Sequence, residues 1–531
     1  MQSALRSTAA GRSAANRESS HPLNIGSGMR VGISSFGSWM LGVGSIIGSM
    51  AWIIHGPMLA KAGPAATLSA WAIAGVLSFP LALILMELSS MFPSAGGPYV
   101  YKYYALKRLM PGMGELMGFL TGWLFWAAIT VGLACMANGM VNMLASMIWS
   151  ASQAPLYFGP ASILALFGSA TFLNFLSISA ASKLNNLFTL MKFAMAGSFI
   201  ALVLSSGRWH LENAFQIASP AGSTDFAANV SSVLMLAMAG FSFLEMASCT
   251  SSETVDAQKT VPKATFMTLL SVTAIYLSMC FCVSVAAPFV LSPDKSTLMI
   301  QGSSIPANCP GIAGLLGGSF IGNAFASSVV ASIFACGFSA VLGIARVSFS
   351  MAETKLFPAQ FAQLDPKTKV PRFALWFQFV CVCLIAITAN LLARTGVMPD
   401  AYAFLGETFG FLYAFVAILY GVCVVSLRYT DPEMKRGFRI GKSGNWLVWL
   451  MALVTVSIWS YAAFICTQWT HQLTGLFVLL CGIPVYFYYK RRNAALSSDN
   501  NRRARRSAAR RRGAQALMMK TKACIKQKQG E

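Results

Sequence analysis

Two ionisable residues stand inside apolar stretches of this sequence, where a charge is costly. Lys192 lies in LNNLFTLMKFAMAGSF, and Glu245 lies in LMLAMAGFSFLEMASC. A charged side chain at the centre of a membrane-spanning helix costs about 2.5 kcal/mol or more, so both residues are candidate functional groups. Each also has a structural interpretation. Lys192 could extend its ammonium to the membrane surface, although it lies roughly 13 Å into its apolar run, and Glu245 could be satisfied by a neighbouring helix.

A cluster of glycines is the third feature. The stretch GVGSIIGS contains Gly42, Gly44 and Gly48. Each glycine costs a helix about 1 kcal/mol relative to alanine, and in lipid every backbone group that a helix releases must find another partner. The cluster indicates either close helix packing through Gly44 and Gly48 or an unwound segment whose backbone binds a ligand. Gly240, followed by Phe241 in a later apolar stretch, favours the unwound segment.

The elements that must position these residues are membrane-spanning helices. The chain has 531 residues, of which 56% are hydrophobic and 11% are charged, whereas soluble domains carry about 25% charged residues. An apolar run of about 20 residues suffices to cross a bilayer. The sequence therefore predicts an all-α polytopic membrane protein. The twelve predicted transmembrane helices are residues 30–56, 64–90, 113–147, 160–179, 184–205, 229–250, 264–291, 320–350, 373–393, 402–427, 446–468 and 472–490.

The distribution of Lys and Arg predicts the orientation of these helices. With the N-terminus in the cytoplasm, sixteen Lys or Arg fall in the internal loops and four in the external loops, so both termini are expected to be cytoplasmic. Residues 1–29 are rich in Ser, Ala and Arg, and we interpret them as a disordered arm rather than an organellar transit peptide. Residues 491–531 form a basic cytoplasmic tail, which we expect to contact anionic lipid rather than nucleic acid.

The two glycine-containing spans are the first and the sixth, five spans apart. Interrupted helices at corresponding positions of two halves are typical of inverted-repeat transporters, whose site lies at the interruptions. A half-helix presents positive N-terminal and negative C-terminal ends, which together suit a zwitterion. Within a transporter domain over residues 30–490, this predicts a first repeat at 30–205, a second repeat at 229–427, and helices 11 and 12 at 446–490.

Five motifs then resemble a known family, the amino acid–polyamine–organocation (APC) permeases. The resemblance extends over residues 30–490 and rests on the order of the motifs as well as their content. The motifs are GVGSIIGS, MELSSMFPSAGGPYVY, GFLTGWLFW, FSFLEMASCTSSETVDAQKTVPKA and ARVSFSMAETKLFPAQFAQLDPKTKVPRFAL. The resemblance implies a 5+5 inverted repeat, the LeuT-like or APC fold, with helices 1 and 6 broken.

The resemblance also implies roles for individual residues. The ammonium of Lys192 would occupy the place of sodium in related sodium-coupled transporters, and a desolvated lysine can exchange a proton near neutral pH. Glu245 is the second candidate for proton coupling, and Phe241 resembles the family's gate over the substrate. Met50 and Phe243 stand where the family usually has glycine, which adds bulk near the expected pocket and implies a substrate that is either smaller than usual or unusually oriented. The expected substrate-binding residues are Gly44, Ser45, Ile46, Ile47, Gly48, Ser49, Ala239, Gly240 and Phe241.

The predicted function is secondary active transport of amino acids by alternating access, as proton symport. Exchange of an amino acid for an amine is the alternative, and a transporter-like nutrient sensor is a further one, disfavoured by short tails of low complexity. An enzyme is not expected, because no nucleophile–base pair, phosphate loop or metal cluster stands out among the residues. The expected partners are a small-molecule substrate, protons and lipids of a cell membrane, inner or plasma, with no cofactor, metal or nucleic acid.

Overall fold

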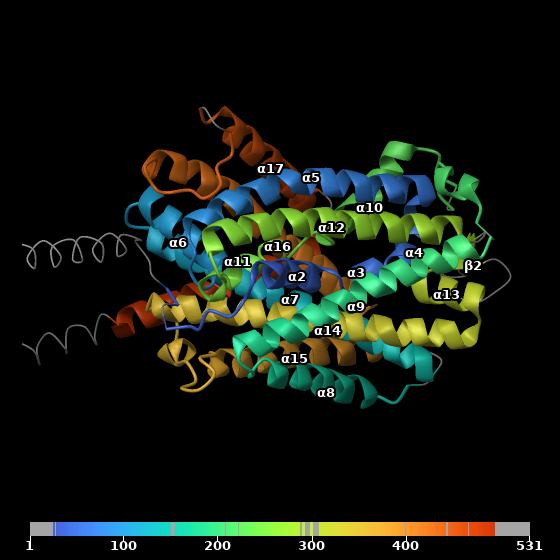
Figure 1. The fold of residues 1–531 in the computed structure, drawn as a ribbon, viewed down its shortest axis with the longest axis horizontal. Helices are drawn as coiled ribbons and strands as arrows, with labels where there is room; N and C mark the ends of the chain where they lie inside the picture. The colour runs from blue at the N-terminus through green and yellow to red at the C-terminus, as the bar shows by residue number, and fades with distance from the viewer. Residues whose placement is uncertain are drawn as a thin grey trace, which may run out of the picture.

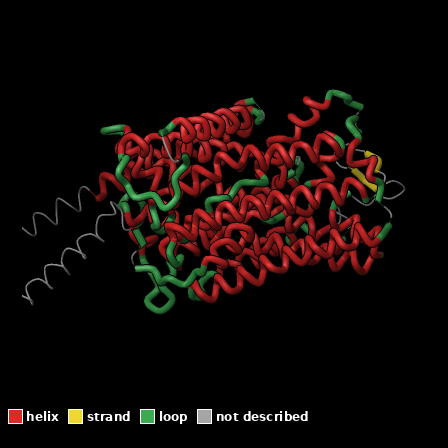
Figure 2. Tube along the Cα trace, turned by 45° about the horizontal axis from the view of Figure 1, so that its top comes forward, coloured by secondary structure: helices red, strands yellow, loops and turns green. Residues whose placement is uncertain are grey.

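Long helices lie side by side along one direction (Figure 1), and loops join them at the two ends of the bundle (Figure 2). This computed structural model describes residues 25–493, apart from residues 27, 150–153, 208, 221, 287–288, 292–297, 301–306, 399, 442–443 and 466. The predicted arm at residues 1–29 and the basic tail at 491–531 lie almost wholly outside the described residues.

The helices follow one another with few other elements. The first half contains α2 (Ser35–Ile46), α3 (Ser49–Trp52), α4 (His55–Ala62), α5 (Pro64–Met91), α6 (Gly97–Leu109), α7 (Gly114–Ile148), α8 (Phe158–Leu173) and α9 (Ile178–Ser205). The second half contains η1 (Leu211–Phe215), α10 (Phe226–Ala239), α11 (Met246–Cys249), η2 (Ser251–Glu253), α12 (Ala257–Val285), α13 (Cys309–Gly317), α14 (Ser319–Glu353), η3 (Ala359–Ala362), α15 (Arg372–Arg394), α16 (Ala401–Thr430), α17 (Trp446–Phe464) and a last helix, Trp469–Asn493. Strands β1 (Phe289–Leu291) and β2 (Leu298–Ile300) pair antiparallel between α12 and α13.

Nine helices within the described part of the chain are long and apolar enough to cross a membrane. They coincide with every predicted span except the first, fourth and sixth, which confirms a polytopic membrane protein. The fourth span, predicted at residues 160–179, is the shorter α8, and the sixth, predicted at 229–250, divides into α10 and α11. The first span divides into α2, α3 and α4.

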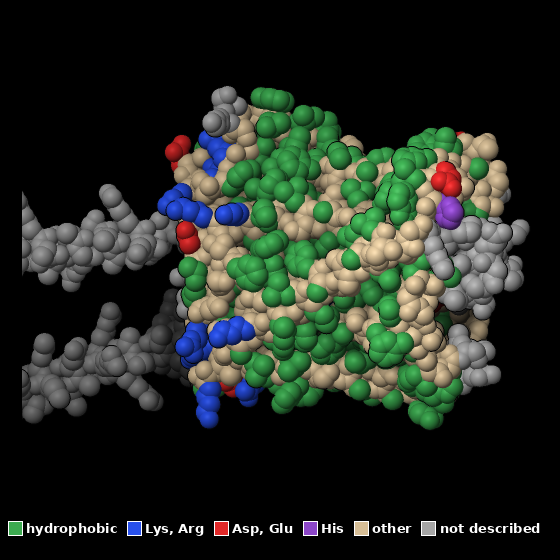
Figure 3. Space-filling view, turned by 45° about the vertical axis from the view of Figure 1, so that its right-hand side comes forward, with side chains coloured by type: hydrophobic (Ala, Val, Ile, Leu, Met, Phe, Trp, Pro, Cys, Tyr) green, Lys and Arg blue, Asp and Glu red, His purple; other side chains and the backbone are tan. Residues whose placement is uncertain are grey.

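The surface of the bundle fits an apolar surrounding. Hydrophobic side chains cover the middle of the face in Figure 3, and Lys and Arg gather at one end of that face. Large hydrophobic side chains such as Phe320, Leu384 and Trp446 are more than half exposed. Soluble monomers rarely expose much contiguous apolar surface, so this exposure suits helices that cross a membrane.

Hydropathy gave one predicted span the wrong bounds and left one helix unpredicted. The seventh span, predicted at residues 264–291, begins earlier, at Ala257, and ends at Val285, while residues 289–291 form β1. Hydropathy misses a polar first helical turn and does not distinguish a short apolar strand from a helix. It also missed α6, whose mean hydropathy is low although most of its residues are buried between α7 and α16.

The first helix breaks at the glycine cluster. Helix α2 ends at Ile46, and Ile47 is extended, with φ −74° and ψ 94°. Gly48 has φ −127° and ψ −136°, outside the helical region, before α3 starts at Ser49. A bulky residue would crowd this turn, because a Cβ on Gly48 would lie 3.2 Å from the Cys336 sulfur.

The second break lies in the sixth span. Helix α10 ends at Ala239, and α11 begins only at Met246. Between them, Phe243 has φ 75°, a left-handed conformation that costs a bulky side chain energy and that the surrounding structure must impose. Glycine would adopt this conformation without that cost.

Candidate functional site

A small cavity lies between the two helix breaks. Its volume is about 30 Å³, room for about two water molecules, so this conformation encloses only a small space between the breaks. None of the described side chains that line the cavity carries a formal charge. The lining residues are Ile46, Ser49, Met50, Gly132, Cys135, Met136, Ala239, Gly240, Ser242, Phe243, Gly406 and Phe409.

Four of the nine residues predicted to bind substrate line this cavity. They are Ile46 and Ser49 at the first break, and Ala239 and Gly240 at the second. The other five, Gly44, Ser45, Ile47, Gly48 and Phe241, lie in the same two segments but do not line it.

The two residues noted as departures from the family pattern also face the cavity. Met50 and Phe243 both line it, and the Phe243 ring packs 5.4 Å from the ring of Phe409, centroid to centroid. The two bulky side chains that the sequence predicted near the pocket therefore form part of the cavity wall. The individual lining residues of α7 and α16, including Gly132 and Phe409, were not predicted, because nothing in an apolar helix marks which face meets a cavity.

Phe241 packs away from the lining. Its side chain is fully buried, and its ring makes edge-on contacts with Trp71 of α5 and Tyr276 of α12, at centroid distances of 6.2 and 5.5 Å. In this closed conformation Phe241 is part of the wall behind the second break. Its role as a gate stays a prediction.

Tyr276 connects the two breaks, and sequence reasoning missed it. Its hydroxyl donates a hydrogen bond to the carbonyl oxygen of Gly240, at 2.8 Å, and lies 3.4 Å from the carbonyl oxygen of Ile46. Both carbonyls stand at helix ends, where no intrahelical partner is available. A single buried phenol on α12 therefore ties the end of α10 to the end of α2.

Lys192 binds the end of α2 directly. Its ammonium is fully buried and donates a hydrogen bond to the carbonyl oxygen of Gly44, at 2.6 Å. The next carbonyl, that of Ser45, accepts from the Cys336 sulfur at 2.9 Å. A cation at a helix C-terminus is favourable, since the last carbonyls are unpaired and carry partial negative charge. The Lys192 side chain is therefore directed into the bundle and has no exposed surface.

The glycine at position 44 allows this approach. A Cβ there would lie 2.6 Å from the Thr189 hydroxyl oxygen and 2.8 Å from the Asn185 side-chain oxygen. Asn185 in turn accepts a hydrogen bond from Ser339 of α14, at 2.5 Å. Close packing of α2 on α9 and unwinding at the next turn are therefore both present, and the two interpretations of the glycine cluster are not exclusive.

Glu245 lies at the start of α11, beyond the cavity. It is fully buried, and its Oε2 accepts a hydrogen bond from the hydroxyl of Tyr413 at 2.7 Å. Its Oε1 has no hydrogen-bond partner among the described residues. The structure thus places Lys192 and Glu245 at different breaks, and it does not bring the two side chains together.

Two buried ion pairs fasten one end of the bundle. Arg346 of α14 binds Glu253 with two hydrogen bonds, at 2.8 and 3.1 Å. Arg428 of α16 binds Glu87 of α5 at 2.6 and 2.7 Å, and Arg436 adds a contact at 3.2 Å. Glu87, near the end of α5, is therefore the centre of an ion-pair cluster.

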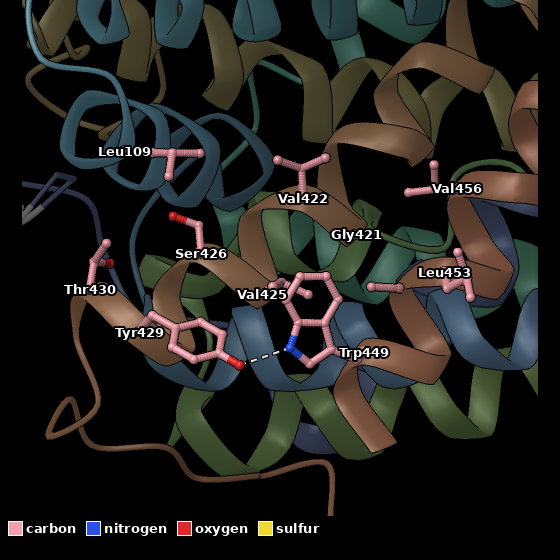
Figure 4. Close-up of a pocket in the computed structure, with 11 residues that line it drawn as sticks. Leu109, Gly421, Val422, Val425, Ser426, Tyr429, Thr430, Trp449, Leu453 and Val456 are labelled. Carbon is pink, nitrogen blue, oxygen red and sulfur yellow. Dashed lines mark hydrogen bonds between the residues drawn. The ribbon is translucent and has the colours of Figure 1, made fainter. Parts of the chain in front are cut away.

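A larger apolar groove lies between α16 and α17 (Figure 4). It has a volume of about 460 Å³, and the Trp449 ring nitrogen donates a hydrogen bond to the Tyr429 hydroxyl at its edge, at 2.8 Å. Its lining is almost entirely apolar, including Leu109, Val422 and Leu453. None of its described lining residues is charged, so the groove offers a zwitterion no counter-charge.

The fold and the cavity define a class of protein. A bundle of membrane-spanning helices with two interrupted helices around a closed central cavity is the architecture of a membrane transporter. Residues 33–487 match the family model described as amino acid permease, and the chain belongs to that family. Its members are transporters, so the chain is not an enzyme. Within the described residues, no group of three or more His, Cys, Asp or Glu is placed to hold a metal.

Several characterised permeases are similar to the chain. The glutamate/serine transporter AimA of Bacillus subtilis is 27% identical, over 86% of this chain and 81% of the relative. The branched-chain amino acid permease BcaP of the same organism is 26% identical, over 77% of this chain and 83% of the relative. The serine/threonine exchanger SteT, also of Bacillus subtilis, is 26% identical, over 66% of this chain and 74% of the relative.

Proposed function

We propose that this protein moves a small neutral amino acid across a cell membrane by alternating access. The observation that carries the proposal is that two helix breaks face one closed cavity. The ends of α2 and α10 supply carbonyl oxygens for the ammonium of an amino acid, and the first-turn amides of α3 supply donors for its carboxylate. The cavity must open further to admit a substrate.

The wall of the cavity limits the side chain that fits. Met50, Met136, Phe243 and Phe409 fill much of the space. The lining offers hydroxyl and thiol groups but no charge that would compensate a charged substrate side chain, and an uncompensated buried charge is costly. We therefore propose serine or alanine as the substrate, in preference to glutamate, lysine or leucine. The names of AimA and SteT both include serine.

We propose proton symport as the driving mechanism, with Lys192 as the group that exchanges the proton. The ammonium at the Gly44 carbonyl, at 2.6 Å, holds the end of α2. Loss of the proton would weaken that hydrogen bond and release the helix end. Exchange without net proton movement is the alternative, supported by the similarity to the exchanger SteT.

We also propose twelve membrane crossings in a 5+5 inverted repeat, with both termini in the cytoplasm. The nine long helices account for most of the crossings, and α8, the α10–α11 segment and the α2–α4 segment supply the remaining three. The basic side chains gathered at one end of the molecule (Figure 3) support the orientation, because Lys and Arg are enriched on the cytoplasmic side.

Uptake into proteoliposomes tests the function. Radiolabelled L-serine, L-alanine, L-leucine, L-glutamate and L-lysine are offered separately, with and without an inward proton gradient. We expect uptake of serine or alanine, stimulated by the gradient, and little uptake of lysine. Uptake of none of the five would contradict the proposed function. Uptake of leucine or glutamate in preference to serine would contradict the argument from the cavity wall.

Tyr276→Phe is expected to reduce initial uptake about tenfold while the protein still reaches the membrane. Removal of the hydroxyl leaves the Gly240 carbonyl buried without its donor, a cost of about 1–3 kcal/mol, and unties the two helix ends. Tyr461→Phe is the matched control, because Tyr461 is about half exposed on α17. Equal uptake by Tyr276→Phe and wild type would show that the link between the breaks is dispensable.

A further inference from the structure

Lys102 is a second buried lysine, and the proposed mechanism does not use it. It lies on α6, is fully buried, and its Nζ has no hydrogen-bond partner among the described residues. The ammonium lies 4.2 Å from the ring centroid of Tyr420 on α16 and 5.1 Å from that of Phe125 on α7. Cation–π contacts compensate part of the cost of burial, but an ammonium has three donors, and all three are unused.

Two further groups beside Lys102 have unused hydrogen-bonding capacity. Within the described residues, neither the hydroxyl of Tyr420 nor Oε1 of Glu245 makes a hydrogen bond of ordinary geometry, although the hydroxyl lies close enough to Glu245 and Tyr101 to interact with both. Helices α6 and α11 lie together at one end of the bundle (Figure 1) and contact each other. We call Lys102, Tyr420 and Glu245 the Lys102 cluster.

The charges around Lys102 point to Glu245 as its counter-ion. Burial lowers the pKa of Lys102, and the opposing influences come from Cys423, Glu245 and Cys249. The titratable groups that face the cluster are Tyr413, Tyr420 and Cys423 from α16, Glu245 and Cys249 from the α11 segment, and Tyr101 from α6. Of these, a carboxylate is the one that is ordinarily ionised near neutral pH.

Two buried opposite charges stabilise each other's ionised forms, and removal of one leaves the other uncompensated. Glu245 also stands two residues beyond Phe243, which lines the cavity. A change in the charge of Glu245 would therefore act close to the second helix break. The other oxygen of Glu245 remains held by Tyr413.

We propose that Lys102 and Glu245 form a second ionisable pair beside the second helix break. In this pair, Lys102 determines the pH at which Glu245 loses its proton, and this in turn determines the pH range over which the transport cycle runs. This proposal rests on the proposed transport function. It is independent of proton coupling through Lys192, which lies at the first break. Lys102 is a positioning residue in this scheme, because nothing places it against the substrate.

The test is counterflow of labelled L-serine into proteoliposomes loaded with unlabelled L-serine, at equal internal and external pH between 5 and 9. Equal pH removes any proton driving force, so the profile reports the cycle alone. The inflection that Glu245→Gln removes is assigned to Glu245. In Lys102→Met we expect this inflection to move to higher pH by about one unit. Lys102→Arg should keep the wild-type profile, and so should the control Lys107→Met, which removes an exposed charge from the same helix.

An unmoved inflection in Lys102→Met would overturn the pair. If Lys102→Met fails to reach the membrane, the double variant Lys102→Met with Glu245→Gln decides the matter. Recovery of folded protein in the double variant supports the pair, because both charges are then absent. If the double variant also fails to fold, the pair is overturned. If wild type shows no serine counterflow, the transport proposal is at fault. In that case the pair is tested separately by the pH dependence of thermal unfolding in wild type and in Lys102→Met. Identical pH profiles of the two proteins would count against the pair.

Discussion

Lys192→Met is expected to abolish accumulation of serine against its gradient while serine exchange survives. Methionine fills a similar volume but carries no proton and cannot donate to the Gly44 carbonyl, to which the ammonium now binds at 2.6 Å. A cycle that needs a titrating group at this helix end can no longer respond to a pH gradient. Exchange of one bound substrate for another requires no net proton movement, so it should persist.

The measurement is serine uptake at several external pH values with the internal pH held near 7.5, an arbitrary working value in the neutral range. Wild type should respond to the gradient, and Lys192→Met should not. Lys183→Met is the control, because Lys183 is exposed on the same helix, α9. A full proton response in Lys192→Met would make Lys192 structural and leave Glu245 as the next candidate. A response of wild type to sodium instead of protons would reject the coupling assignment.

Arg346→Met should destabilise the protein by about 3–5 kcal/mol, the cost of breaking a buried ion pair by removal of one partner. Arg346 and Glu253 are each about 1% exposed, and the guanidinium binds both carboxylate oxygens. The backbone carbonyl of Glu253 also accepts from the amides of Gly32 and Ile33, just before α2. Loss of Arg346 would therefore loosen the segment that leads into the first broken helix.

Thermal unfolding in detergent, followed by the loss of monodisperse protein, measures this effect. The double variant Arg346→Met with Glu253→Gln should regain most of the lost stability, because no unpaired charge then remains. Arg372→Met is the contrasting control. Arg372 is half exposed, while its partner Asp365 is 12% exposed. An ion pair open to solvent on one side is expected to contribute about 0–1 kcal/mol. Equal effects of Arg346→Met and Arg372→Met would contradict the argument from burial.

The sequence by itself determined the class of protein and the places where its helices break. The length of an apolar run can be read directly from the local sequence, and nine of the twelve predicted spans therefore coincide with long helices. The glycine cluster ending at Gly48 and the glycine at 240 mark the two interruptions, because a released backbone group within lipid needs a special partner. The cost of burying a charge likewise singled out Lys192 and Glu245, and both are fully buried.

Only the tertiary structure decided how these parts meet. Tyr276 lies 36 residues from Gly240 and 230 from Ile46, and a tyrosine in an apolar helix gives no local sign that it will bind both. Helix α6 and the burial of Lys102 escaped prediction because a short polar helix is buried by contacts with α7 and α16, which hydropathy does not register. Phe241 follows the glycine as predicted but turns toward Trp71, because the conformation of the unwound segment, with Phe243 at φ 75°, determines which ring faces the cavity. Side-chain direction in an unwound segment depends on every element packed around it, so it is settled by packing and not by sequence spacing.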